Sequence, residues 1–294
     1  MPLSGIIWAK GLPGSAERRP IGLAAGEGGR NISNSNGETH ASGNEQTLDL
    51  WPIGNCQASA LIDRAGRMVW GCVPRVDGDP VFSALLDHEG WEDPEARGFW
   101  AIELENVVAV EQHYIRNTPI LVTRQRDAQG NAIETYDFCP RHRHKGRMYR
   151  PVAFVRIVRP VAGSPRIRVR LRPTTSWNAE KVPVSYGSNH IRMVLSYMAM
   201  RVSTNAPIGL ISQESWFRLE ADMHFFMGPD EGFSDALRPA IERMLDDTIL
   251  EWQIWVRGLA IPAEWQEAVI RSAITLKLCQ HEETGAIVAA LTTS

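Results

Sequence analysis

Paired carboxylates are the residues in this sequence that could carry general acid–base chemistry, in which one carboxyl group donates a proton and the other activates water. The candidate pairs are Glu282 with Glu283, Asp77 with Asp79, and Glu103 with Glu105. The first pair is adjacent at an expected helix end, points apart and is expected to be solvated. The second lies in a Gly/Pro loop, where aspartates commonly form turns. The third alternates along an expected strand, where exposed carboxylates are common. We therefore assign no catalytic residue from the sequence.

Histidines form the next candidate group. The basic segment 141–145 holds His142 and His144, which are two residues apart and would share one face of a strand. Such a segment could bind phosphate or a metal ion, but two histidines without a third ligand make a poor metal site. His190 could hydrogen-bond a sugar hydroxyl or be a loop histidine satisfied by its neighbours. We expect no metal and no cofactor, and the substrate-binding residues stay unassigned.

Tryptophan is unusually frequent, because the 294 residues contain 10 Trp beside 5 Tyr and 8 Phe. Exposed Trp rings can stack on sugars, although Trp is also a large core residue. Trp91, Trp100 and Trp177 are the candidate stacking platforms. A net charge of -3 gives no pull toward nucleic acid or an anionic membrane. Because no apolar run approaches the ~20 residues of a membrane span, we expect neither kind of partner.

The cysteines favour a protein with reduced thiols. Cys56, Cys72, Cys139 and Cys279 are far apart and lack the spacing of a metal site. Most of them have apolar neighbours, as buried free cysteines do. Because the N-terminus also lacks the apolar core of a signal peptide, we expect a cytoplasmic protein.

The elements that must position these residues begin after a polar leader. Residues 1–46 contain a Gly/Asn/Ser-rich stretch that cannot bury enough apolar surface to fold. We expect a disordered leader there, or an extension from a wrongly assigned start codon. From about residue 48 to 230, short alternating segments separated by turns predict a mainly β, antiparallel sandwich.

Two hairpins and one charged strand stand out within this region. The turns at 63–67 and 127–131 each carry Asp and Gly between strand-like segments, 59–62 with 68–72 and 120–126 with 132–138. Residues 166–172 alternate strictly between Arg and apolar residues. We expect the four Arg of that strand to face solvent.

The period then changes to that of helices. Apolar residues recur at three- and four-residue steps over 234–256, with Pro239 near the start of the regular part and Gly258 as the stop, which predicts an amphipathic helix over 234–258. A second helix is expected over 262–280. Its main apolar stripe consists of Trp265, Val269, Ser272, Ala273, Leu276 and Cys279.

The second helix carries more apolar surface than one packing partner needs. Ile270, Ile274 and Leu278 lie off the main stripe, so a second partner is implied. The apolar segment 286–291 follows it, near the last residue, Ser294. Either the natural polypeptide continues, or this tail packs back onto the sheet.

Several motifs resemble bacterial family 15 glycoside hydrolases, the group of glucoamylases, glucodextranases and trehalases. The early motifs include Trp51-Pro-Ile-Gly54, Ala60-Leu-Ile-Asp63 and Val69-Trp-Gly-Cys-Val-Pro-Arg75. The most specific are Glu264-Trp-Gln-Glu-Ala-Val-Ile-Arg-Ser-Ala-Ile-Thr-Leu-Lys-Leu278 and Thr284-Gly-Ala-Ile-Val-Ala-Ala-Leu-Thr-Thr-Ser294. The resemblance covers about residues 48–294.

This resemblance implies a fold and a division into domains. Residues 48–230 would form an N-terminal β-supersandwich, 234–258 a linker helix, and 262–294 the first helix and the start of a truncated (α/α)6 catalytic barrel. The family needs two Glu residues, a general acid and a general base, about 6.5–9.5 Å apart for inversion. In the family both come from later barrel loops that have no counterpart in this sequence.

We therefore expect the N-terminal fragment of a family 15 glycoside hydrolase. The complete enzyme would hydrolyse α-glucosidic bonds of a glucan or trehalose with inversion, and this chain alone would be inactive, so whether to class it as an enzyme stays open. The alternative is a stand-alone carbohydrate-binding or interaction module that uses its surface Trp. An uncovered C-terminal helix would also allow self-association.

Overall fold

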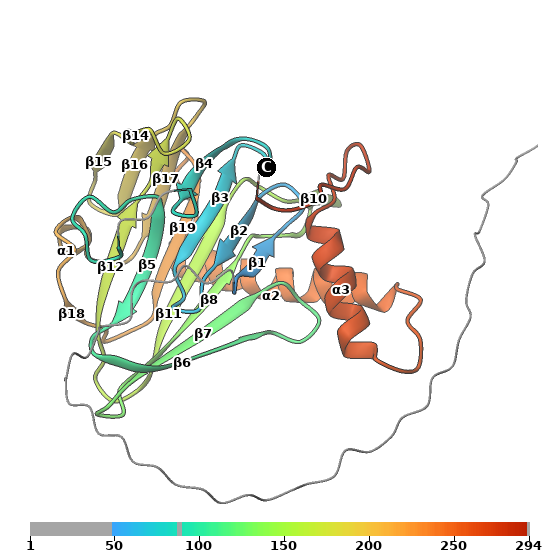
Figure 1. Cartoon of the computed structure of the whole chain (residues 1–294), viewed down its shortest axis with the longest axis horizontal. Coiled ribbons are helices and arrows are strands. Elements are labelled where there is room, and N and C mark those ends of the chain that lie inside the picture. The colour runs from blue at the N-terminus through green and yellow to red at the C-terminus, as the bar shows by residue number, and fades with distance from the viewer. Residues whose placement is uncertain (1–48, 87–89, 293–294) are drawn as a thin grey trace, which may run out of the picture. The chain divides into compact units, whose positions relative to one another are not determined.

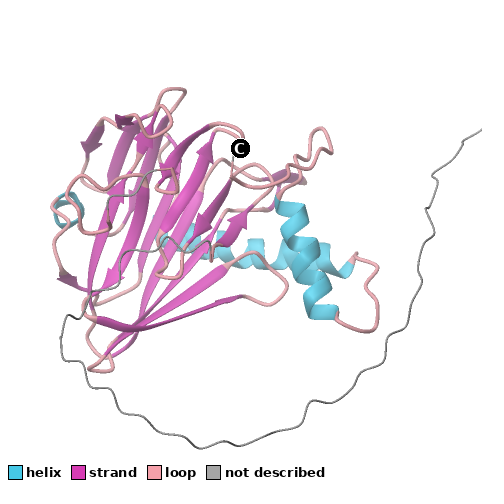
Figure 2. Ribbon diagram, in the orientation of Figure 1, coloured by secondary structure: helices cyan, strands magenta, loops and turns pink. Residues whose placement is uncertain are grey.

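Antiparallel strands dominate the computed structural model, which describes residues 49–86 and 90–292 (Figure 1). Figure 2 shows two of the helices crossing at one end of the strands. The expected leader, residues 1–46, lies outside the described residues. Most of the described strands belong to two sheets, which we call sheet A and sheet B.

Each of the two sheets combines strands that follow one another in the sequence with strands that are far apart in it. Sheet A has the order β1 (Trp51–Gly54), β2 (Ser59–Ile62), β3 (Met68–Val73), β5 (Phe99–Leu104), β12 (Arg166–Arg172) and β18 (Phe217–Arg218), with β4 (Asp79–Ser83) paired to β3. Sheet B has the order β15 (Val184–Tyr186), β16 (His190–Val194), β17 (Ala199–Thr204), β19 (Met223–Pro229), β11 (Phe154–Ala162), β8 (Ala132–Phe138), β7 (Leu121–Asp127) and β6 (Val107–Tyr114). Smaller elements are β9 (His142–His144) with β10 (Arg147–Tyr149), β13 (Thr174–Thr175) with β14 (Glu180–Lys181), and α1 (Ile208–Ser212).

The core lies between the two sheets. Trp100 of sheet A is fully buried and meets Phe225 of sheet B edge-on, with 6.0 Å between ring centroids. Phe82 and Phe154 make a second contact between the sheets at 6.1 Å. Because alternate residues of each strand point inward, both sheets contribute to one apolar layer. The prediction of a mainly β fold with antiparallel sheets is therefore confirmed.

Both predicted hairpins are present, and one device closes each turn. The carboxylate Oδ1 of Asp63 accepts the backbone N–H of Ala65 and of Arg67, each at 2.9 Å. Asp127 Oδ1 accepts two backbone N–H groups in the same way across the β7–β8 turn. The Asp residue at the turn start thus supplies the local hydrogen bonds that the glycine-containing turn requires.

The prediction that the four arginines of strand β12 face solvent is wrong for Arg170. The Arg170 side chain is only 1% exposed, and it pairs with Glu103 on the neighbouring strand β5. Arg168 pairs with the same carboxylate at 2.9 Å. The cross-strand Glu103 therefore pairs with two of the arginines that the alternating pattern alone assigned to solvent.

Helix α2 (Leu237–Arg257) confirms the first predicted helix and ends at Gly258. Its residues Ile241 and Leu245 pack on the face of sheet B that is turned away from the main core. Thr248, the polar member of the predicted stripe, is buried and accepts the backbone N–H of Arg141 at 3.1 Å. The helix is thus attached along its length to the β region.

Helix α3 (Gln266–Leu278) is shorter than predicted, and the residues off its main stripe have the second packing partner that the sequence implied. Ile274 and Leu278 are buried against Trp252 and Val256 of α2. On the expected main stripe, by contrast, Trp265 is 79% and Leu276 is 59% exposed. The off-stripe residues make the contacts with α2, and of the main stripe Cys279 packs against Leu61 and Leu291 while Trp265 and Leu276 stay exposed.

Candidate functional site

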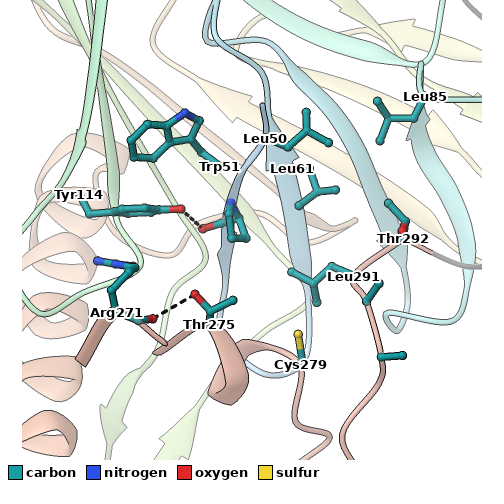
Figure 3. Close-up of a pocket in the computed structure, with 13 residues that line it drawn as sticks. Leu50, Trp51, Leu61, Leu85, Tyr114, Arg271, Thr275, Cys279, Leu291 and Thr292 are labelled. Carbon is teal, nitrogen blue, oxygen red and sulfur yellow. Dashed lines mark hydrogen bonds between the residues drawn. The ribbon is translucent and has the colours of Figure 1, made fainter. Parts of the chain in front are cut away.

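A groove of about 650 Å³ runs between sheet A and helix α3 (Figure 3). It lies where strand β1, helix α3 and the last described residues meet. Its lining consists of Leu50, Trp51, Pro52, Leu61, Leu85, Tyr114, Arg271, Thr275, Cys279, Ala289, Ala290, Leu291 and Thr292. Most of these side chains are apolar, so the groove is suited to receive an apolar surface.

One wall of the groove is aromatic and cationic. The rings of Trp51 and Tyr114 lie 5.2 Å apart, and the Arg271 guanidinium lies 3.8 Å from the Tyr114 ring centroid. Arg271 Nη2 donates to the carbonyl of Thr118 at 2.7 Å, and the Tyr114 hydroxyl donates to the carbonyl of Pro52 at 2.8 Å. Burial lowers the pKa of Arg271. These contacts join α3 to strands of both sheets.

The groove does not contain acid–base machinery. None of its described lining residues is Asp, Glu or His. Its Tyr114 hydroxyl is committed to Pro52, and burial raises the pKa of that phenol. The described lining of the groove is therefore mainly apolar and offers no carboxyl or imidazole group.

The backbone at residues 286–292 closes one side of the groove. Leu291 is buried beside Leu61 and Trp70, and its carbonyl accepts the Trp70 indole N–H at 3.0 Å. Ile287, four residues earlier, is 60% exposed. Leu291 therefore packs back onto the sheet, as one of the two alternatives for the apolar segment 286–291 expected. The start of the segment, at Ile287, faces outward.

Glu282 lies at the centre of an ion-pair cluster beside the groove. Its Oε1 lies 2.8 Å from Arg141 Nη2 and 2.7 Å from Lys277 Nζ, and its Oε2 lies 3.3 Å from Arg150 Nε. Burial opposes ionisation, but the hydrogen bonds from Arg141 and Lys277 outweigh it and lower the pKa of Glu282 to about 2. The expectation of a solvated carboxylate is therefore wrong for Glu282, whereas the Glu283 side chain is 68% exposed.

The other candidate carboxylates form ion pairs or hydrogen bonds within the fold. Asp77 forms an exposed pair with Arg75. Glu103 is bound by the arginines of β12, and Glu105 pairs with Arg166 at 3.0 Å. Asp79 is buried and accepts hydrogen bonds from the backbone of a distant loop. None of the three predicted pairs forms two opposed carboxyl groups around a cleft.

The predicted histidine positions form no metal site. His142 and His144 both face the Tyr149 ring, at 5.0 and 6.4 Å between centroids, so they do share one face of β9. Across the described residues no group of three or more His, Cys, Asp or Glu side chains is placed to hold a metal ion. His190 hydrogen-bonds the side chain of its neighbour Asn189 at 3.1 Å.

The three candidate Trp platforms differ in exposure. Trp100 is fully buried between the sheets, so this prediction is wrong. Trp91 is half-buried and covered by the Arg67 guanidinium at 3.6 Å from its ring centroid. Trp177, at 48% exposure, keeps an accessible indole. Composition alone does not separate these three environments.

Two further observations concern the cysteine thiols and the length of the helices. All four cysteines are free, and burial raises the pKa of Cys56 to about 11 and that of Cys72 to about 12. Among the described helices, none combines the length and apolar character that crossing a bilayer requires.

Comparison with known proteins gives one family match and several relatives. Residues 44–225 match the family "Trehalase-like, N-terminal". The chain is 26% identical over 257 residues to a trehalase of Thermoplasma volcanium, covering 82% of this chain and 39% of that protein. It is also 26% identical to trehalases of Mycolicibacterium smegmatis and Mycobacterium tuberculosis, again over 82% of this chain, and over 39% and 38% of those proteins. The chain thus spans about two fifths of these relatives. No solved structure matches.

Proposed function

Because this chain belongs to the trehalase-like N-terminal family, we propose that it is the β domain and first barrel helix of a family 15-type glycoside hydrolase. The complete enzyme would hydrolyse the α-glucosidic bond of trehalose or an α-glucan with inversion. The β region would be the supersandwich, α2 the linker helix and α3 an outer helix of the catalytic barrel. The name shared by the relatives favours trehalose as the first substrate to test.

Helix α3 carries this proposal. Ile274 and Leu278 fasten one of its faces to α2, and the Glu282 cluster fastens its C-terminal end to the β region. Its other face presents Trp265 and Leu276 to solvent. A helix that is fixed on one side and apolar on the other is suited to support further helices. We propose that the groove at its foot receives part of the same barrel.

We propose that the 294 residues alone do not hydrolyse glucosides. Inversion requires a protonated carboxyl group opposite a carboxylate that activates water. Glu282 is held ionised by three cations, Glu103 is bound by arginines and Asp79 accepts backbone N–H groups. A carboxylate stabilised in its charged form is a poor general acid near neutral pH.

An activity assay tests this proposal. The purified chain is incubated with trehalose and with maltooligosaccharides, and released glucose is measured. We expect no release above the buffer control. A longer protein in which the same residues are followed by a complete barrel should release β-glucose from maltooligosaccharides and equal amounts of α- and β-glucose from trehalose, because inversion acts at one anomeric carbon only. Glucose release at enzyme-like rates by the 294 residues alone would refute the inactive-fragment proposal.

A stand-alone carbohydrate-binding role is a second candidate function, and the exposed Trp177 is the observation that favours it.

The exposed residues of α3 support the proposal that the isolated chain self-associates. Size-exclusion chromatography with light scattering tests this, and a monomer at all concentrations would contradict it. The free, largely buried thiols support a cytoplasmic location.

A further inference from the structure

Residues Ser176, Trp177 and Asn178 form a left-handed turn directly after β13. Their φ angles are 56°, 55° and 72°, so three consecutive non-glycine residues occupy the left-handed region. This region is unfavourable for residues with a Cβ, and it persists only where surrounding contacts impose it. A turn of this kind therefore points to a side chain that has to be presented in one orientation.

A buried carboxylate imposes the turn. Asp79 accepts the backbone N–H of Ser176 at 2.6 Å and that of Trp177 at 2.7 Å. It also accepts the Thr175 hydroxyl at 2.9 Å. Asn178 is buried, and its Oδ1 accepts the Ser83 hydroxyl at 3.1 Å. Contacts from strand β4 thus hold the turn on both sides of Trp177.

Hydrogen bonds of Thr175 also connect this turn to a neighbouring loop that carries a second exposed aromatic residue. The hydroxyls of Thr175 and Ser196 lie 2.6 Å apart, and the Ser196 backbone N–H donates to Thr175 Oγ1 at 3.2 Å. The next residue, Tyr197, is 75% exposed, and Trp177 is 48% exposed. Two hydrogen-bonded loops therefore each present one exposed aromatic ring on a rigid backbone.

The surroundings of these rings suit a sugar better than a protein. An apolar protein interface needs a continuous apolar patch. In the sequence around the two rings, exposed polar residues such as Glu180 and Ser196 are mixed with the exposed apolar residues Pro183 and Val194. Separate exposed rings in a mixed polar and apolar surface suit a pyranose, which has an apolar face and a hydroxyl rim.

We propose that Trp177 and Tyr197 form a surface binding site for a neutral α-glucan oligosaccharide, separate from any catalytic centre. The sugar class rests on the proposed function, whereas the existence of the site rests on the turn itself. Preorganisation by Asp79 reduces the ordering entropy that binding would otherwise cost. We therefore expect an oligosaccharide of several glucose units to bind more tightly than the disaccharide trehalose, which offers only two pyranose rings for stacking.

Isothermal titration of the full 294-residue chain with maltoheptaose tests the site, with trehalose and cellopentaose as comparison ligands. The first variant is Trp177→Asn, because Asn tolerates the left-handed region and removes only the ring. We expect it to weaken maltoheptaose binding by roughly tenfold or more. Trp177→Tyr should restore most of the affinity, and Tyr197→Ala should weaken it by a smaller factor.

Trp265→Asn is the matched control. Trp265 is also an exposed indole with a positive φ of 61°, but it lies at the start of α3. We expect the affinity of the Trp265→Asn variant for maltoheptaose to stay within about twofold of that of the parent chain. The proposal is overturned if the parent chain gives no binding heat, or if Trp177→Asn binds as the parent does. It is also overturned if Trp177→Asn abolishes self-association instead, which would identify a protein interface.

This outcome is independent of the hydrolysis assay. Sugar binding without any activity in a barrel-containing protein would contradict the proposed function and keep the surface site. Hydrolysis by the barrel-containing protein without oligosaccharide binding at Trp177 would support the proposed function and contradict the surface site.

Discussion

At the scale of single residues, Glu282 shows how a charged side chain acquires its role from distant partners. Arg141 lies 141 positions away in the sequence and is only 6% exposed. Two other cations complete the cluster, and their charges hold the carboxyl group ionised. The cluster therefore links the end of α3 to the β region through charge rather than through apolar packing.

This cluster predicts a pH-dependent contribution to stability. The pKa of Glu282 in the folded chain, about 2, lies below its ordinary value. The contribution is therefore fully present above the ordinary carboxyl pKa and is lost as the pH falls toward 2. We expect Glu282→Gln to lower the free energy of unfolding at pH 7 by about 1–2 kcal/mol, after allowance for solvent screening. Urea denaturation from pH 7 to pH 2.5 measures the effect, which should shrink as the pH falls.

Glu283→Gln is the control for this measurement. The Glu283 side chain is 68% exposed and lies 3.9 Å from Arg150. We expect a change of less than about 0.5 kcal/mol at pH 7. Equal effects of the two substitutions would contradict the assignment of the cluster to Glu282.

At the scale of elements, helix α3 shows why an apolar period does not identify the face that packs. Two apolar stripes share this helix, and a single-sequence pattern favours the wider one. The structure packs the narrower stripe, because the C-terminal half of α2 presents Trp252 and Val256 to Ile274 and Leu278. Trp265 and Leu276 of the wider stripe stay exposed, and these residues are the ones that the proposed barrel would cover.

A pair of substitutions separates the two faces. We expect Ile274→Ala to reduce the free energy of unfolding by about 2–4 kcal/mol, because it opens a cavity between α2 and α3. Leu276→Ala, at a residue that is 59% exposed, should cost less than about 0.5 kcal/mol. Urea denaturation followed by far-UV circular dichroism gives both values. The reverse order would mean that the predicted stripe is the packed one.

At the scale of the whole described unit, a buried ion pair connects the two sheets. Arg156 and Asp137 on sheet B are both fully buried and lie 2.7 Å apart between Nε and Oδ1. The same guanidinium donates to the carbonyls of Trp100 and Gly66, each at 2.6 Å, and Trp100 lies on sheet A. One side chain thus satisfies backbone groups at the sandwich interface that water does not reach.

Removing one partner should destabilise the sandwich. We expect Arg156→Met to lower the free energy of unfolding by about 3–5 kcal/mol, because it leaves the Asp137 carboxylate buried without its counter-charge. The double variant Arg156→Met with Asp137→Leu should recover part of this loss. Chemical denaturation of both variants measures the difference. A loss below about 1 kcal/mol in the single variant would contradict this role.

The local features of this protein follow from sequence alone. Asp and Gly at fixed offsets determine the turns at 63–67 and 127–131, and the 3.6-residue period with Gly258 determines α2. These signals act within a few residues, so no distant partner is needed to read them.

The tertiary structure decides which residues are buried and which are paired. It buries Trp100 and exposes Trp177, pairs Glu282 with cations, and leaves Leu276 of α3 exposed. It also brings Tyr114 and Arg271 together in the groove from segments far apart in the chain. Each of these outcomes depends on contacts with another element of the fold, such as the Arg141–Glu282 pair 141 positions apart or the packing of α3 on α2, and local residue patterns carry no information about such contacts.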